Sequence, residues 1–142
     1  MLTPEQVTLV QQTFAELVPA ADAAAEAFYG RLFEVAPAVQ QLFLGDMTEQ
    51  RRKLMASLAF VVRGLSDLPS ILPAASALAK RHVEYGVKPE HYPVVGEALL
   101  WTLARALGPR WTPQIASAWT AAYATLSDVM IEAAYAPPHA AE

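Results

Sequence analysis

Three polar side chains on otherwise apolar helical stretches carry the chemistry that this sequence could perform. His82 lies where an apolar helix would otherwise present a hydrophobic side chain, in a segment that ends at Gly86. Upstream, Tyr29 and Gln50 each lie on the apolar face of another expected helix, and Phe43 precedes a sharp break. A neutral imidazole ligates metals, whereas a phenol and an amide donate hydrogen bonds. Together these residues indicate a flat apolar cofactor with a metal ligand on one side and polar donors on the other.

Each of these residues also has an ordinary structural interpretation. A lone histidine such as His82 is by default a core residue whose ring bonds a carbonyl. Tyr29 could be an amphipathic core residue, Gln50 could cap backbone N–H groups, and Phe43 could be a core aromatic. The order and spacing of the four residues, rather than any one of them, favour the cofactor site.

The elements that position these residues are all predicted to be helices. Prolines and glycines mark the boundaries, Thr3, Thr48 and Thr112 are the expected N-caps, and apolar residues recur every three or four positions between them. The expected helices span about residues 4–18, 21–35, 37–42, 48–65, 72–85, 89–107 and 113–135, with a break at 66–69 and a frayed tail at 136–142. We therefore expect an all-α chain of about seven helices that forms one domain over residues 1–142.

Composition and charge narrow the classes of function. The 142 residues contain no cysteine, which excludes disulfides, iron–sulfur clusters, thiolate-ligated haem and covalent haem attachment. The net charge is −4, and the longest basic cluster is the triplet 51–53, which is expected to be a solvated helix face. Binding to nucleic acid is therefore disfavoured.

The apolar content of the chain is high. Hydrophobic residues make up 54% of the sequence and the mean hydropathy is +0.24, which fits a surface that packs on a cofactor or on a second subunit. No apolar run approaches the roughly 18 residues that a membrane span needs, and the N-terminus lacks the regions of a signal peptide. We therefore expect no membrane span and a cytoplasmic location.

Haem is the flat cofactor that suits this set of residues. Its iron needs an axial nitrogen from a neutral imidazole whose other ring nitrogen bonds a carbonyl, and the Leu78 carbonyl is the candidate partner of His82. The 48–65 helix contains no histidine, so the opposite side stays open for a gas. Tyr29 and Gln50 are the two candidate donors to a bound gas that carries partial negative charge. Each neutral hydrogen bond contributes about 0.5–1.5 kcal/mol.

Several segments resemble a known family. The matching segments are Ala27–Phe33, Leu42–Phe43, Gln50–Leu54, Leu68–Pro73, His82 with Tyr85–Val87, His91–Leu100 and Ala118–Tyr123. With Tyr29, Gln50 and His82 in register, the whole chain resembles bacterial single-domain haemoglobins of the flavohaemoglobin and Vitreoscilla haemoglobin kind. The resemblance implies a globin fold, a three-on-three helical sandwich with a haem pocket, and non-covalent haem b.

The resemblance also implies roles for individual residues. His82 would be the proximal ligand and the only metal ligand from the protein. Phe43 would pack on the haem, Leu54 would line the distal pocket, and Tyr92 would lie near the proximal histidine. Val95, which follows Tyr92 on the same apolar stripe, is a further expected cofactor contact.

One position departs from the family pattern. Relatives tend to carry a late glutamate that polarises the proximal histidine, whereas the aligned position here is Ala134. Glu132 is two residues away, about 200° around a helix, and should face elsewhere. This departure argues against peroxidase-like chemistry.

The resemblance leaves three classes of function open. The first is reversible binding of dioxygen, with nitric oxide and carbon monoxide as further ligands, for storage, delivery or scavenging. The second is nitric oxide dioxygenase, which would need a separate reductase because the sequence holds no segment to bind flavin or NAD. A gas sensor is the third. A homodimer is also expected, because the apolar content is high and related bacterial globins often pair.

Overall fold

Residues 2–43, 46–84 and 86–135 are described by the computed structural model, and these residues form helices and no strand. The six α-helices are α1 (Pro4–Leu17), α2 (Ala21–Val35), α3 (Met47–Gly64), α4 (Leu68–Glu84), α5 (His91–Leu107) and α6 (Pro113–Tyr135). Short 3-10 segments connect some of them: η1 (Val18–Ala20), η2 (Pro37–Leu42), η3 (Leu65–Asp67) and η4 (Gly108–Arg110). The all-α prediction is confirmed, but the expected helix at 37–42 is a 3-10 helix, because proline begins it and the chain leaves it after six residues. The corner at 44–45, Tyr85 and the expected frayed tail at 136–142 lie outside the described residues.

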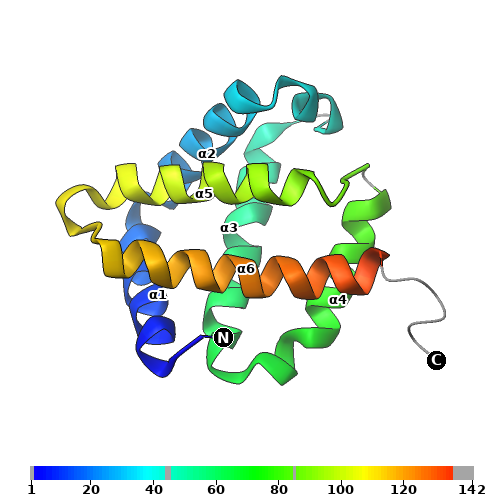
Figure 1. Cartoon of the computed structure of the whole chain (residues 1–142). Helices are drawn as coiled ribbons and strands as arrows, with labels where there is room; N and C mark the ends of the chain where they lie inside the picture. The colour runs from blue at the N-terminus through cyan, green and yellow to red at the C-terminus, as the bar shows by residue number, and fades with distance from the viewer. Residues whose placement is uncertain (1, 44–45, 85, 136–142) are drawn as a thin grey trace.

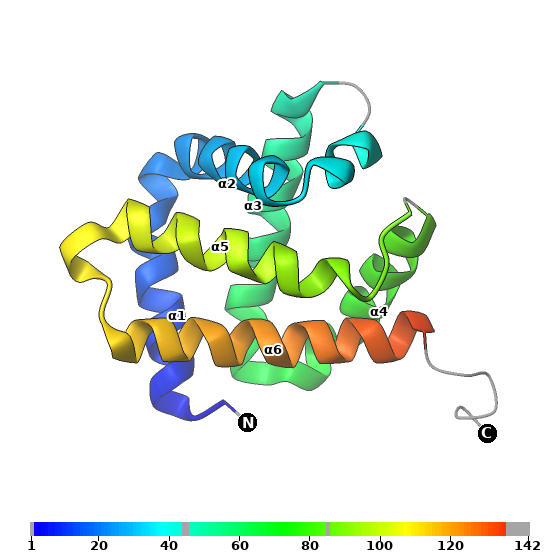
Figure 2. The same ribbon diagram turned by 45° about the horizontal axis from the view of Figure 1, so that its top comes forward.

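The α-helices form two crossed layers. Figures 1 and 2 show α5 and α6 side by side, with α1 and α3 crossing behind them. Helix α2 packs on α5 and α3, whereas α1 and α4 pack on opposite ends of α6. The arrangement of α1, α3 and α4 against α2, α5 and α6 is the expected three-on-three sandwich.

Local capping explains where the helices begin. Thr3 and Gln6 form a reciprocal capping box at α1, and the Thr112 hydroxyl accepts a hydrogen bond from a backbone N–H in the first turn of α6. At α3 the cap is Asp46, whose carboxylate accepts a hydrogen bond from the backbone N–H of Thr48 at 2.9 Å. The prediction that Thr48 caps this helix was wrong, because Asp46 has extended backbone and Thr48 already lies within the first turn.

The helix after the expected break at 66–69 begins earlier than predicted, at Leu68 instead of about residue 72. Only η3 separates α3 from α4, and Pro69 lies in the first turn of α4, where its missing N–H costs nothing. The two helices meet closely at Gly64, where an added Cβ would lie 2.1 Å from Cγ2 of Ile71. The absence of a side chain at Gly64 therefore permits the sharp turn between α3 and α4 that both views show.

The near-continuous helical stretch Met47–Val83 is long and apolar enough to cross a membrane by length and composition alone. Its most apolar window has a mean hydropathy of 1.3, and 17% of that window is buried. Length and composition alone do not establish a span, because mostly buried core helices meet the same criteria. The stretch also turns at η3, so it is not one straight helix. The absence of a membrane span stays a prediction.

Most buried side chains belong to one core between the layers. It is lined by Val10, Phe14, Leu17, Phe28, Tyr29, Leu32, Val62, Leu65, Leu99, Leu103 and Trp119, among others. Within it, the Trp119 indole N–H donates to the Thr13 hydroxyl at 2.8 Å, so this pair of buried polar groups is satisfied.

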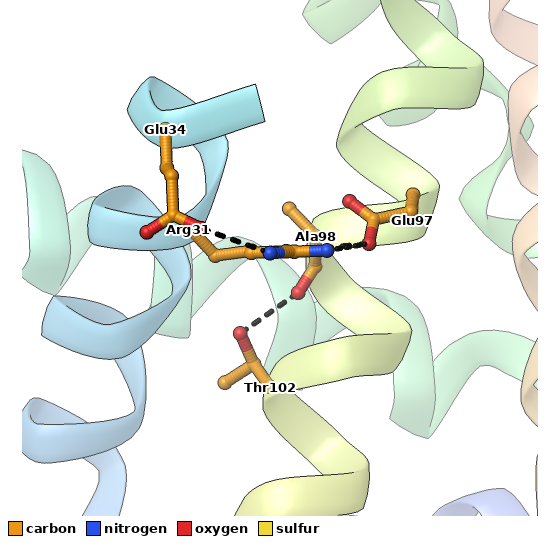
Figure 3. A network of polar contacts seen from close by, with 5 residues as sticks. All are labelled: Arg31, Glu34, Glu97, Ala98 and Thr102. Carbon is orange, nitrogen blue, oxygen red and sulfur yellow. Dashed lines mark hydrogen bonds and ion pairs between the residues drawn. The ribbon is translucent and has the colours of Figure 1, made fainter. Parts of the chain in front are cut away.

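A polar network holds α2 against α5 (Figure 3). The Arg31 guanidinium pairs with Glu34 at 3.0 Å and reaches across to Glu97 on α5 at 2.9 Å. The same group lies 5.2 Å from the centroid of the Trp101 ring. Exposed ion pairs contribute little to stability. The pair between Arg31 and Glu97 connects the surfaces of α2 and α5.

Candidate functional site

Tyr29 lies at the centre of an aromatic group formed by α2 and the segment that follows it. Its ring is 5% exposed and contacts Phe28, Phe33 and Phe43, with ring centroids 5.0, 5.9 and 5.3 Å away. The contacts with Phe28 and Phe43 are edge-to-face, which is a favourable geometry for aromatic rings. Phe43 comes from beyond η2, so the turn after α2 folds the chain back over Tyr29.

Gln50 contacts Tyr29 directly from α3. The Gln50 side-chain amide donates to the Tyr29 hydroxyl oxygen at 3.1 Å. The neighbouring Arg51 pairs with Asp22 on α2 at 3.3 Å and is partly buried, so the triplet 51–53 is not wholly a solvated face. These two contacts hold the start of α3 against α2.

The Tyr29 hydroxyl is held in its neutral form. Burial raises the pKa of Tyr29 above its ordinary value, and the hydrogen bond from Gln50 opposes this shift only in part. Because the hydroxyl oxygen already accepts from Gln50, its own proton is oriented away from the amide and can be donated. The pair therefore presents a phenolic donor whose position is fixed by both helices.

His82 lies in the last turn of α4 and is half-buried. Its Nδ1 is 2.8 Å from the Leu78 carbonyl oxygen, as predicted. A carbonyl only accepts hydrogen bonds, so Nδ1 carries the proton and Nε2 carries the ring lone pair. Burial lowers the pKa of His82, which favours this neutral imidazole.

The end of α4 is fixed by the glycine that the sequence predicted. Gly86 has a positive φ of 94°, and its N–H donates to the Val83 carbonyl at 3.0 Å. The Val87 N–H donates to the His82 carbonyl at 3.0 Å. These paired bonds form a Schellman motif, which holds the turn containing His82 in helical geometry.

Tyr92 belongs to a second, smaller apolar cluster. It is 6% exposed and packs with Ala79 of α4 and Met130 of α6, so it is not the surface residue that a position at a helix start would suggest. Ala134 packs against the same cluster, whereas Glu132 is exposed. The position at which the resemblance led us to expect a glutamate thus carries a methyl group that packs in this cluster.

Tyr123 lies in a segment that resembles the family, but no role for its hydroxyl followed from the sequence. Its hydroxyl donates to the Tyr92 carbonyl at 2.6 Å, and its ring lies so close to α5 that a Cβ at Gly96 would be 2.7 Å from Cε2. These contacts join residues far apart in the chain, so no local pattern could have indicated them.

The predicted site residues fall into two groups. Tyr29, Gln50 and Phe43 lie in direct contact, and the half-buried Leu54 and Val95 pack on the same main core. Tyr92 lies in the second cluster with Ala79, and His82 follows Ala79 by three residues on α4. Haem iron takes a neutral, oriented imidazole as its ligand, and the chemistry of His82 fits that cofactor.

These features define an all-α protein with a histidine on one helix and a polar pair on two others. The family model for globins matches residues 26–130. The chain belongs to the globin family.

Known proteins similar to this chain are bacterial haemoproteins and globins. The proteins named Flavohemoprotein from Bordetella parapertussis and Deinococcus radiodurans are each 34% identical over 134 residues, which cover 92% of this chain and 33% of each relative. The chain thus spans about a third of the length of these curated relatives.

Two solved structures are similar over nearly the whole chain. A bacterial globin from Campylobacter jejuni has a TM-score of 0.83 and 26% identity, over 92% of this chain and 95% of that one. An engineered carbene transferase, described as a putative nitric oxide dioxygenase from Rhodothermus marinus, has a TM-score of 0.81 and 27% identity, over 92% and 91%. Membership of this family implies haem binding.

Proposed function

We propose that this globin holds haem b non-covalently, with His82 as its proximal ligand, and binds dioxygen reversibly. The observation that carries the proposal is the hydrogen bond between Tyr29 and Gln50, because it places two donors from separate helices at one point in an otherwise apolar core. The haem would supply the iron at which dioxygen, nitric oxide or carbon monoxide binds.

The chain's own residues would have distinct tasks. His82 presents Nε2 as a neutral ligand, since Nδ1 is committed to Leu78. Tyr29 would donate a hydrogen bond from its hydroxyl to a bound gas, and the amide of Gln50 orients that hydroxyl. The apolar walls exclude water, which strengthens a hydrogen bond inside the pocket.

Three further residues would hold the cofactor by packing. Phe43 and Leu54 would contact the haem on the side of Tyr29, and Val95 would add an apolar contact from α5. Tyr92 would support the proximal side from the second apolar cluster. Ala134 packs in that cluster and Glu132 is exposed, so neither position offers a buried carboxylate late in α6, which supports gas binding over peroxidase-like chemistry.

We propose storage, delivery or scavenging of dioxygen as the primary role. Nitric oxide dioxygenase activity is the second candidate, favoured by the similarity to the putative nitric oxide dioxygenase from Rhodothermus marinus. That activity consumes electrons, and we propose that a separate reductase supplies them.

An absorption spectrum of the purified protein tests the haem and its ligand. The expected ferrous, ligand-free spectrum is five-coordinate, and dioxygen should change it reversibly. A six-coordinate ferrous spectrum would contradict the open gas side, and a protein without haem bands would refute the proposal. Steady-state consumption of nitric oxide, measured with and without an added flavin reductase, then separates the two roles: turnover only with reductase supports the dioxygenase.

We also propose that two copies of the chain pair through α4. Leu72 and Val83 are each 41% exposed, and eleven residues place them on the same face of the helix about three turns apart. Sedimentation should give two chain masses for the natural sequence and one for Leu72→Lys. A single chain mass for the natural sequence at micromolar concentration would contradict the dimer.

A further inference from the structure

The turn that ends α4 contacts a residue from a distant part of the chain. A Cβ added at Gly86 would lie 3.2 Å from Cδ2 of Leu42, the last residue of η2. Of the described residues beyond the chain neighbours of Gly86, only Leu42 has an atom within 4 Å of that Cβ. In Figures 1 and 2, η2 and the end of α4 lie on the same side of the molecule. The contact therefore joins two elements that carry different parts of the proposed site.

On one side, this contact is tied to His82. The Gly86 N–H donates to the Val83 carbonyl, and the Val87 N–H donates to the His82 carbonyl, both at 3.0 Å. Val87 also packs against the second apolar cluster. Because these bonds hold the turn as one unit, a shift of Gly86 moves the backbone from which the His82 imidazole projects.

On the other side, Leu42 is tied to Tyr29. Leu42 packs against the main core, and the next residue is Phe43, whose N–H donates to the Gln40 carbonyl at 3.1 Å. The centroid of the Phe43 ring lies 5.3 Å from that of Tyr29 and 5.4 Å from that of Phe33. Closely packed side chains transmit strain to their neighbours. A shift of Leu42 therefore reaches Tyr29 through one intervening residue.

We propose that Leu42 is a positioning residue that couples the turn carrying His82 to Tyr29. The inference rests on the proposed haem and gas binding and adds a connection between the two sides of that site. The connection runs through direct protein contacts, since Leu42 meets Gly86 and its neighbour Phe43 meets the tyrosine ring. A change on the histidine side should therefore alter the placement of the Tyr29 hydroxyl, and a change at Leu42 should alter the iron–histidine bond.

Resonance Raman spectroscopy of the ferrous, haem-loaded protein tests the effect of Leu42 on the histidine side. Leu42→Ala removes the contact and should shift and broaden the iron–histidine stretching band. Leu42→Met has a side chain of similar volume and should keep the band of the natural sequence. Val39→Ala is the control and should also keep it, because Val39 is a buried residue of η2 outside the contact with Gly86. An unchanged band in Leu42→Ala, or an equal shift in Val39→Ala, would overturn the proposal.

Infrared spectroscopy of the carbon monoxide complex tests the opposite direction, because the C–O stretching frequency responds to hydrogen-bond donors near the gas. Gly86→Ala places a Cβ against Leu42 and should change this frequency, although residue 86 belongs to the histidine side. In the Leu42→Ala background that Cβ has more space, so Gly86→Ala should change the frequency much less. Equal changes in both backgrounds would overturn the coupling.

Dioxygen dissociation separates this inference from the proposed function. The rate should be about twofold higher or more in Leu42→Ala than in Val39→Ala, as expected for coupled residues. Bound haem with the natural Raman band and the natural rate in Leu42→Ala would overturn the coupling and leave the proposed function intact. A natural sequence without an iron–histidine band would refute the proposed function and this inference with it. If Gly86→Ala does not fold because of its positive φ of 94°, the Raman comparison of Leu42→Ala with Leu42→Met still decides.

Discussion

Replacement of Tyr29 by phenylalanine is the sharpest test of the polar pair. The change removes the hydroxyl and keeps the ring, so the contacts with Phe28, Phe33 and Phe43 are preserved. One neutral hydrogen bond is worth about 0.5–1.5 kcal/mol, and about 1.4 kcal/mol corresponds to a factor of ten. We expect dioxygen to dissociate about tenfold faster from Tyr29→Phe than from the natural sequence.

The geometry also predicts how Gln50 contributes. Gln50→Leu leaves the Tyr29 hydroxyl in place and removes only the amide that orients it at 3.1 Å, so its effect should be smaller. Because the two side chains are in contact, the double variant should deviate from additivity by about 0.5 kcal/mol or more. Gln11→Leu is the matched control, since the Gln11 amide binds the Val62 carbonyl at the other end of α3.

Stopped-flow displacement of dioxygen by carbon monoxide gives the dissociation rate for each variant. Gln11→Leu should match the natural sequence. An unchanged rate in Tyr29→Phe would refute the role of the tyrosine as the donor to bound gas. Strict additivity of Tyr29→Phe and Gln50→Leu would refute their action as one network.

Three further predictions follow from the structure. His82→Ala should lose normal haem retention, measured as the haem absorbance that remains after gel filtration, while Tyr29→Phe should keep it. Gly64→Ala should lower the free energy of unfolding by about 1–3 kcal/mol, because its Cβ would lie 2.1 Å from a side-chain carbon of α4. Gly30→Ala is the control in the same denaturant titration, since its Cβ would meet nothing within 4 Å, and equal midpoints would contradict the clash. Burial raises the pKa of Tyr29 and of Tyr123 above 10.0. The native state therefore keeps these two protons to a higher pH than the unfolded chain does. The free energy of unfolding should have its full value below pH 10 and should fall as the pH rises above 10. Phenolate absorbance should show these two tyrosines titrating only with alkaline unfolding, and their titration in the folded protein near pH 10 would contradict the prediction.

Much of the fold could be predicted from the sequence because its determinants are local. A capping box at Thr3 and the proline after Thr112 start helices through bonds within one turn. Gly86 ends α4 because it adopts a φ of 94°, which other residues rarely adopt. The bond from His82 to the Leu78 carbonyl spans a single turn, so the orientation of the imidazole was also predictable.

Other local features were predicted wrongly because neighbouring residues compete for the same role. Asp46 and Thr48 are both good N-caps, and only the backbone conformation before α3 decides for Asp46. Prolines at the start of 37–42 and near 69 indicate a helix start or a break equally well. The first segment became a 3-10 helix, and the second became the first turn of α4, since Gly64 lets the two helices meet.

The sequence by itself determined which residues are helical, which faces are apolar and which three polar side chains interrupt those faces. Only the tertiary structure decided that Gln50 bonds Tyr29, 21 residues away, and that Tyr123 supports Tyr92 across 31 residues. The physical reason is the range of the interactions: helix periodicity and capping act within one or two turns, whereas side-chain pairing and packing depend on how whole helices cross.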